Sequence, residues 1–371
     1  MKEINIAKII MAKRKEKGVT QDDLAEYMGV SKASVSKWET GLCYPDITFL
    51  PQLATYFNIS IDELMGYSPQ MAKEDINKTY HRLAEEFGRR PFDEVLDECH
   101  AVIKKYYACF PLLMRMAILL LNYCILAKEK AKQEALMQEI IDLCDRIKRE
   151  SDDVWLAKQA NSIEAACHVF LRQPQEVLKL LDGTMKPLID DAPLLANAYQ
   201  MTGDVEKAKS VLQISLYQHL LSLFGSAGPY LMMIAAKPEK FEQALDRFLD
   251  ISKIFDLEHL HPNTVCVLCL TAAQGYAMQN NREKALQMLE NYTRVCTSML
   301  LPFKLKEDEF FDNIEIWFKE FDAEAPRDEK TVKTSIVQGV AENPLFNVLH
   351  DEPEYKSIIE KLKAFAGQED K

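Results

Sequence analysis

The sequence lacks both an apolar run long enough to span a bilayer and a secretion signal at its N-terminus. Its most apolar stretch, residues 114–126 (MRMAILLLNYCIL), is interrupted by Arg115 and Asn122, and it falls short of the ~20 residues that a transmembrane helix needs. The first residues, MKEINIAKIIMAKRKEK, interleave charges with apolar positions, whereas a signal peptide has an unbroken apolar core. We therefore expect a cytoplasmic protein without a membrane span, in which residues 114–126 form a buried helix.

Glycine is scarce, with 12 residues in a chain of 371, while Ala, Leu, Glu and Lys recur. This composition favours helices, and the length favours two or more domains. The nine cysteines follow no framework spacing, which is typical of reduced core residues in a cytosolic protein. The predicted fold class is all-α.

The common signatures of catalysis are also missing. The sequence contains no HExxH, no Gly-rich phosphate loop ending in Lys-Ser/Thr and no Gly-x-Ser-x-Gly, so the usual peptidase, NTPase and hydrolase classes are excluded. We expect no enzymatic activity, no catalytic residue and no cofactor. The isolated histidines have no partner carboxylate at a telling spacing and are interpreted as core or surface residues: His81, His100, His168, His219 and His350.

One segment, LEHLHPNTVCVLC, contains four candidate zinc ligands: His259, His261, Cys266 and Cys269. The two cysteines lie three residues apart in an apolar helical run, a spacing that places both on one buried face. We therefore predict core packing and assign no metal, while the sequence alone leaves open whether these residues ever bind one.

Negative charge dominates the chain but is unevenly distributed. The net charge is −12, yet residues 1–68 hold 8 Lys and Arg against 9 Asp and Glu, which leaves 37 against 48 for the remainder. Positive residues gather in the first predicted helix, at Lys13, Arg14, Lys15 and Lys17. Because a local basic patch matters more for phosphate contact than the total charge, the acidity argues only weakly against binding to nucleic acid.

Two short helices joined by a tight turn are predicted near the N-terminus. Thr20 can cap a helix over QDDLAEYM, with Asp22 and Asp23 in its first turn. Gly29 ends that helix, and Ser31 caps the next one, KASVSKWE. A glycine between two capped helices is typical of a helix-turn-helix.

Two further helices complete a five-helix unit: one after Pro45 capped by Asp46, and one capped by Ser60. The apolar positions at helical spacing predict its core. These residues are Leu24, Ala25, Val30, Val35, Trp38, Leu50, Leu53, Ala54, Phe57, Ile61 and Leu64.

The segments TQDDLAEYMGVSKASVSKWETG and PDITFLPQLATYFNISIDELMG resemble the lambda-repressor-like DNA-binding domain of the XRE family, over about the first 67 residues. The resemblance implies that the helix after the turn enters the major groove, while the preceding helix start and the following loop contact phosphates. The matching positions are Lys32, Ala33, Ser34 and Lys37 for bases, and Gln21, Thr40 and Arg14 for phosphates.

Lysine stands where this family often has glutamine, so the operator sequence stays undetermined. Two other interpretations of the unit remain open. Its polar face could be merely solvated, or the domain could serve a protein contact, since fold alone does not fix function.

A break at Gly66, Ser68 and Pro69 separates this unit from a predicted connecting helix, after which a long helical region begins at Phe92. The predicted domains are residues 1–67, 68–91 and 92–371. For residues 92–371 the pattern predicts about a dozen helices in stacked hairpins, without strand-like alternation.

Internal similarity supports a repeat architecture for residues 92–371. LANAYQMTGDVEKAKSVL and TAAQGYAMQNNREKALQML align with Tyr199 over Tyr276 at an offset of 77 residues. The pattern resembles tetratricopeptide repeats, which implies a superhelix with a concave groove. Four successive copies, spaced by 31, 36 and 41 residues, carry Val177, Ala208, Ala244 and Ala285 at the small position of their second helix.

With this repeat region, the whole chain resembles the peptide-pheromone-sensing regulators of Gram-positive bacteria. The resemblance implies quorum sensing by a homodimer that binds an operator and a short signalling peptide, with Asn197, Gln200, Gln274 and Met278 in the groove. Two alternatives stay open. The repeats could serve only dimerisation or recruitment of a protein, or the chain could be an unrecognised enzyme with a DNA-binding head.

Overall fold

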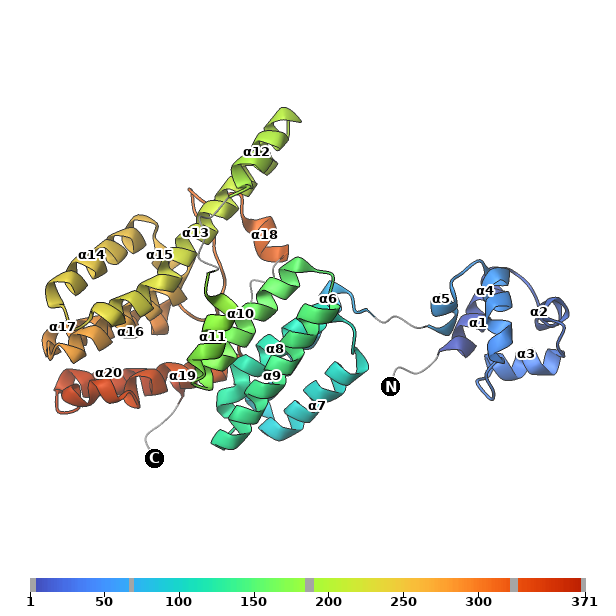
Figure 1. Cartoon of the computed structure of the whole chain (residues 1–371), viewed down its shortest axis with the longest axis horizontal. Helices are drawn as coiled ribbons and strands as arrows, with labels where there is room; N and C mark the ends of the chain where they lie inside the picture. Colours follow the sequence, from blue (N-terminus) through green and yellow to red (C-terminus); the bar gives the residue numbers. More distant parts are fainter. Residues whose placement is uncertain (1–4, 67–69, 184–189, 321–325, 368–371) are drawn as a thin grey trace. The chain divides into compact units, whose positions relative to one another are not determined.

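The computed structural model describes residues 5–66, 70–183, 190–320 and 326–367, and every regular element in these ranges is a helix (Figure 1). The all-α class is thereby confirmed. The chain divides into two compact units, residues 1–83 with 90–180, and residues 84–89 with 181–371. Ser68 and Pro69 of the predicted break lie outside the described residues, and the predicted domain boundaries stay predictions. No helix in the described part has the length and apolar character to cross a membrane.

The N-terminal helices form as predicted because each start is capped. The Thr20, Ser31 and Ser60 side chains each accept a hydrogen bond from the backbone N–H three residues on. Gly29 ends the second helix in the left-handed region at φ 65°. The elements are α1 (Ile6–Glu16), α2 (Gln21–Met28), α3 (Lys32–Glu39), the 3₁₀ turn η1 (Ile47–Phe49), α4 (Leu50–Phe57) and α5 (Ile61–Met65).

The predicted core of this unit is largely confirmed: Leu24, Val35 and Leu53 are fully buried. The prediction for Ile61 was wrong, since 40% of this residue is exposed. Helix α5 has only five residues, and its C-terminal end is tied to the start of α1, where Asn5 N–H donates to the Met65 carbonyl at 3.1 Å. Ile61 begins the helix at the opposite end and therefore stays in solvent.

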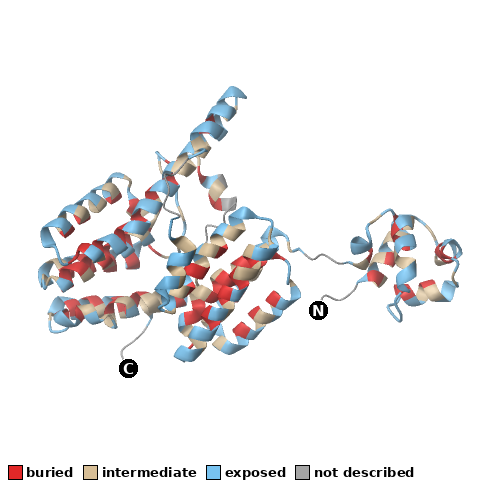
Figure 2. Ribbon diagram, in the orientation of Figure 1, coloured by how far each residue is buried: buried red, intermediate tan, exposed pale blue. Residues whose placement is uncertain are grey.

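The next helices pack around α8, whose eight buried residues confirm the buried helix predicted from the apolar run. Helices α7, α9 and α10 all contact α8, and the burial pattern of Figure 2 shows this core as a buried band. The bounds are α6 (Lys73–Arg89), α7 (Phe92–Lys105), α8 (Phe110–Tyr123), η2 (Cys124–Leu126), α9 (Lys130–Glu150), α10 (Val154–Phe170) and α11 (Pro174–Leu181).

The remaining helices include both hairpins predicted from the best-aligned repeats, α12 with α13 and α16 with α17. Helix α13 is longer than its neighbours, a single helix of 30 residues that continues through Pro229 and contacts both α12 and α14. The bounds are α12 (Ala192–Met201), α13 (Val205–Ile234), α14 (Pro238–Ile254), α15 (Leu257–Leu260), α16 (Pro262–Met278), α17 (Arg282–Ser298), α18 (Glu315–Glu320), α19 (Glu329–Ala341), η3 (Pro344–Leu349) and α20 (Pro353–Ala366).

Small residues bring the repeat helices close together. Ala208 and Ala285 are 2% and 0% exposed, as their repeat positions predicted, whereas Val177 and Ala244 are only half-buried. The closest approach is at Gly275 on α16, where an added Cβ would lie 2.3 Å from the ring of Phe241 on α14. Only glycine fits between these two helices.

Candidate DNA interface and effector pocket

The inner face of α3 is anchored in the core of the N-terminal helices. Val35 is fully buried and Trp38 is 4% exposed, and the Trp38 ring centroid lies 5.7 Å from that of Phe49. Gly29 turns the chain so that Ser31 can cap α3 directly after α2. The helix is thus fixed at a set angle behind a tight turn, which leaves its outer face free.

Three of the four predicted base-contacting residues lie on this outer face: Lys32, Ala33 and Lys37 are all exposed. Ser34 lies nearer the edge, with its hydroxyl 2.9 Å from that of the cap residue Ser31. Ser36 was not among the predicted contacts, although helical spacing places it between Lys32 and Thr40 on the same face. This helical spacing in the sequence could have identified Ser36 as a further candidate.

Lys32 forms an ion pair in the free protein. Its Nζ donates to Asp22 Oδ2 at 2.6 Å, and the two side chains are 60% and 62% exposed. A pair this exposed contributes at most about 1 kcal/mol. Opening this bond therefore costs little, which leaves Lys32 available to another acceptor.

A buried polar network joins α1, α2 and the C-terminal end of α3. Arg14 Nε and Nη2 donate to the two Glu39 carboxylate oxygens at 2.6 and 3.0 Å, and Gln21 Nε2 donates to Glu39 Oε2 at 2.8 Å. The Arg14 and Glu39 side chains are 13% and 3% exposed. Burial alone raises the pKa of Glu39, but the bonds from Arg14 and Gln21 outweigh it and hold this pKa below its ordinary value.

This network bears on the predicted phosphate contacts. Arg14 and Gln21 both direct donors to Glu39, so a phosphate near them would compete with that carboxylate. Thr40 is exposed at the end of α3, where its hydroxyl donates to the Ser36 carbonyl at 2.8 Å. The phosphate roles of these three residues stay predictions.

Residues 10–64 match the helix-turn-helix family. A curated relative, the HTH-type transcriptional activator BcrR of Enterococcus faecalis, is 42% identical over 53 residues, which are 14% of this chain and 26% of BcrR. The N-terminal helices thus form an XRE-like helix-turn-helix domain, as the sequence predicted. The match spans about a quarter of the relative's length.

Two solved structures are similar over most of the chain at low identity. PlcR of Bacillus thuringiensis, in complex with the peptide PapR7 and DNA, is 13% identical with a TM-score of 0.30, covering 86% of this chain and 99% of PlcR. The apo form of the competence regulator ComR of Streptococcus vestibularis is 12% identical with a TM-score of 0.26, covering 86% and 98%. At these scores the courses of the chains differ substantially, and the likeness does not bear on function.

The predicted groove residues fall on two helices. Asn197 and Gln200 are exposed on α12, while on α16 Gln274 is half-buried and Met278 is 50% exposed. None of the four lines the pocket described next, and their role in binding an effector stays a prediction.

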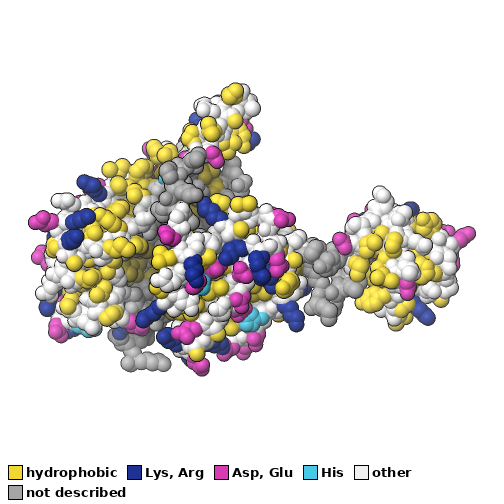
Figure 3. Space-filling view, viewed as in Figure 1, with side chains coloured by type: hydrophobic (Ala, Val, Ile, Leu, Met, Phe, Trp, Pro, Cys, Tyr) yellow, Lys and Arg dark blue, Asp and Glu magenta, His cyan; other side chains and the backbone are white. Residues whose placement is uncertain are grey.

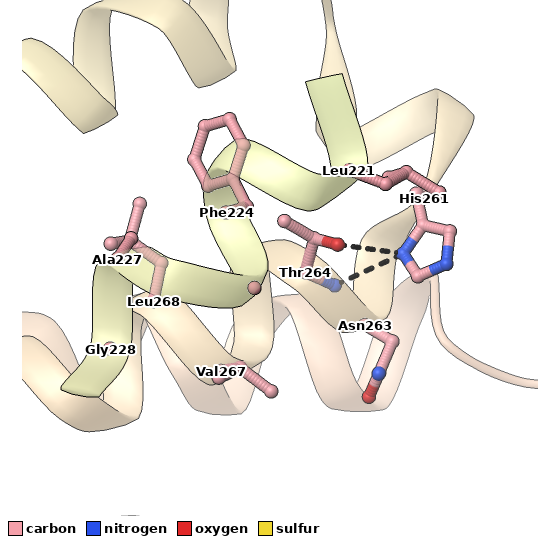
Figure 4. A pocket seen from close by; sticks show the side chains of 10 residues that line it. Leu221, Phe224, Ala227, Gly228, His261, Asn263, Thr264, Val267 and Leu268 are labelled. Carbon is pink, nitrogen blue, oxygen red and sulfur yellow. Dashed lines mark hydrogen bonds between the residues drawn. The ribbon is translucent and has the colours of Figure 1, made fainter. Parts of the chain in front are cut away.

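A pocket of about 270 Å³ lies between α13 and the start of α16 (Figure 4). Its wall combines apolar side chains such as Phe224 and Val267 with a polar end at His261 and Thr264, whose hydroxyl lies 2.8 Å from His261 Nδ1. Burial lowers the pKa of His261, so its ring stays neutral at pH 7. The sequence reasoning missed this site because the residues come from two helices that only the fold brings together.

In the part of the chain that the structure describes, no three His, Cys, Asp or Glu side chains are grouped so that they could hold a metal ion. Cys266 and Cys269 are 4% and 3% exposed in the core of α16, as predicted. Both candidate imidazoles make other contacts. His259 Nε2 lies 3.1 Å from the Glu307 carbonyl, and His261 Nδ1 lies 2.8 Å from the Thr264 hydroxyl. All nine cysteines are free thiols, and eight are buried; Cys43 is exposed, which the prediction of core cysteines did not anticipate.

Proposed function

We propose that this protein is a sequence-specific DNA-binding transcription regulator that reads its operator with α3. The observation that carries the proposal is the division of α3 into two faces. Val35 and Trp38 hold the helix in the domain core, and the opposite face presents short side chains and two exposed lysines. A helix of this kind can enter the major groove and approach base edges closely.

The direct test is binding of the full chain to its operator after Lys32→Ala with Lys37→Ala. Each lost base contact removes about 1–3 kcal/mol, so we expect binding to be weaker by roughly thirty-fold or more without unfolding. The matched control is Lys130→Ala with Lys179→Ala, which removes two lysines that are 85% and 68% exposed on other helices. Unchanged affinity in the α3 variant would refute this docking. Genome-wide mapping of bound DNA supplies the operator.

The salt dependence of binding separates DNA contact from protein contact. Specific binding should weaken steeply with added salt, because each phosphate contact releases counterions. An affinity that does not change with salt would instead indicate that the domain contacts a protein, the alternative left open by the sequence.

The second part of the proposal concerns the helical repeats, which we assign to dimerisation and to sensing of a peptide effector. A palindromic operator has two half-sites about one helical turn (~34 Å) or a multiple apart, so two DNA-binding domains must be held together to contact both. This requirement supports dimerisation. The effector would act by changing the distance between the two DNA-binding domains of the dimer. The alternative, repeats that only dimerise or recruit a protein, predicts DNA binding that no effector alters.

The pocket between α13 and α16 supports the sensing role. Its volume of about 270 Å³ is just below the range of small-molecule sites, about 300–1,000 Å³, and suits one apolar side chain of a peptide whose remainder lies outside. Two glycines, Gly225 and Gly228, form part of its wall.

The test compares bound DNA with and without culture supernatant, in the wild type and in Gly225→Leu. Gly225 forms part of the pocket wall and no atom lies within 4 Å of a Cβ added there, so a side chain can be introduced at this position of the wall. We expect the supernatant to change binding by the wild type only, with equal basal DNA affinity. Ile254→Leu is the control, since Ile254 is 76% exposed on α14.

A further inference from the structure

Helix α13 carries an apolar stripe that faces solvent and is interrupted by Lys209 and His219. Val205, Leu212, Leu216 and Leu223 are 47%, 39%, 52% and 42% exposed. At 3.6 residues per turn, these positions fall on one side of the helix, and Tyr230, which is 42% exposed, continues the line. The core-facing side is different, with Tyr217, Phe224 and Leu231 buried, and Figure 3 shows hydrophobic side chains gathered over α12 and α13.

The partner helix α12 also exposes apolar side chains. It packs on α13 through Ala196, its one buried residue, while Leu194, Leu195 and Met201 are 69%, 47% and 89% exposed. At about 150–200 Å² for each fully exposed large side chain, the five stripe residues of α13 present roughly 400 Å² of apolar surface. An apolar patch of several hundred Å² on a soluble protein is often functional, and about 800 Å² on each partner is the usual size of a stable interface.

The stripe has the symmetry of a surface that pairs with itself. Its first four residues are spaced by seven, four and seven positions, so the spacing is the same in both directions along the helix. Two antiparallel copies of α13, related by a two-fold axis near Ile214, would place Val205 against Leu223 and Leu212 against Leu216. In a two-fold interface each patch meets its own copy, and this palindromic spacing fulfils that requirement.

The charged side chains that α13 carries beside the stripe are paired with neighbours. Lys209 is paired with Glu206 at 3.0 Å and Lys207 with Asp204 at 2.8 Å, all within α13 and its cap. The charges of α13 itself are therefore paired locally, and from other segments Asp190 and Asp312 accept hydrogen bonds from Ser215 and Gln213 at 2.8 Å each. We infer that α13, with α12 beside it, is the dimer interface, and that its occupant is α13 of a second chain in antiparallel register. This inference rests on the dimerisation in the proposed function and names the surface at which the two chains would meet.

The first test is the molar mass of the full chain without DNA, by light scattering or sedimentation. We expect twice the monomer mass at micromolar concentration, and a dissociation constant raised at least 100-fold by Leu212→Glu with Leu216→Glu. The control is Ile254→Glu, at an equally apolar residue that is 76% exposed on α14, which should leave the dimer intact. A wild-type monomer at all concentrations, or a Glu variant that stays dimeric, overturns the inference.

The register is tested by cross-linking in a Cys43→Ser background, because Cys43 is the exposed native thiol. Val205→Cys mixed with Leu223→Cys should form an interchain disulfide on mild oxidation, with two thiols losing two protons and two electrons to the added oxidant. Val205→Cys alone should not, since its copy would lie about 27 Å away along the helix. Cross-linking by the single variant and not by the mixture overturns the register. Neither readout involves DNA, so failure of the DNA-binding proposal is detected separately.

Discussion

Arg14 and Glu39 form a two-pronged ion pair, with N–O distances of 2.6 and 3.0 Å, that joins the first helix to the last residue of α3. A carboxylate that is 3% exposed is costly to bury unless it is paired. Gln21 supplies a third donor to the same carboxylate at 2.8 Å. The pair thus fixes the angle at which α3 leaves the domain and presents its outer face.

Glu39→Ala should destabilise the helix-turn-helix domain by about 3 kcal/mol, because it leaves the Arg14 guanidinium buried without its partner. Amide hydrogen exchange of the full chain measures this directly. Exchange in α1 and α3 should accelerate by roughly a hundred-fold. Glu63→Ala is the control, since Glu63 is 53% exposed in its pair with Lys13, and exchange close to wild type is expected there. Equal rates in both variants would show that the Arg14 pair does not hold the domain.

The same carboxylate predicts a pH dependence. The pKa of Glu39 is lowered in the folded chain, so its contribution to stability is fully present above the unfolded value, about 4.3, and is lost as the pH falls through the folded pKa. We expect the stability advantage of the wild type over Glu39→Gln, measured by urea unfolding of the domain between pH 3 and 7, to shrink below about pH 4. The lowered pKa values of Asp23 and Asp46 affect both proteins alike. An advantage independent of pH contradicts the prediction.

Asp22→Asn should strengthen operator binding. The substitution frees Lys32, which Asp22 holds at 2.6 Å, and removes a negative charge beside the phosphates. Because an exposed pair contributes at most about 1 kcal/mol, the expected gain is up to roughly five-fold in affinity at low salt, decreasing as salt is added. Fluorescence anisotropy with a labelled operator measures it, and Asp62→Asn on α5 is the control. A weaker complex would mean that Asp22 itself contributes to recognition.

Two glycines in the repeat helices should respond to alanine in opposite ways. Gly275→Ala places a Cβ 2.3 Å from the buried ring of Phe241 and should destabilise the chain by about 1–3 kcal/mol. Gly225→Ala meets no atom within 4 Å and should stabilise it by up to about 1 kcal/mol through helix propensity. The apparent thermal midpoints of the two variants should therefore move in opposite directions, and a rise for Gly275→Ala would contradict the close approach of α14 and α16.

Local signals were sufficient for the N-terminal domain. Thr20, Gly29 and Ser31 each act within a few residues of chain, through a cap or a left-handed turn, and the structure has all three as predicted. The core was predictable for the same reason, except at Ile61, whose exposure depends on where the five-residue α5 docks. Packing against a distant helix is not encoded in local periodicity.

The sequence by itself determined the helical class, the helix-turn-helix and the burial of small residues such as Ala208 and Ala285, because capping and helical spacing depend on neighbouring residues. Only the tertiary structure decided that Arg14 and Gln21 both bind Glu39, that Phe224 and His261 line one pocket, and that the α13 stripe stays uncovered. Each of these depends on which helix faces which, a result of side-chain packing between segments far apart in the chain.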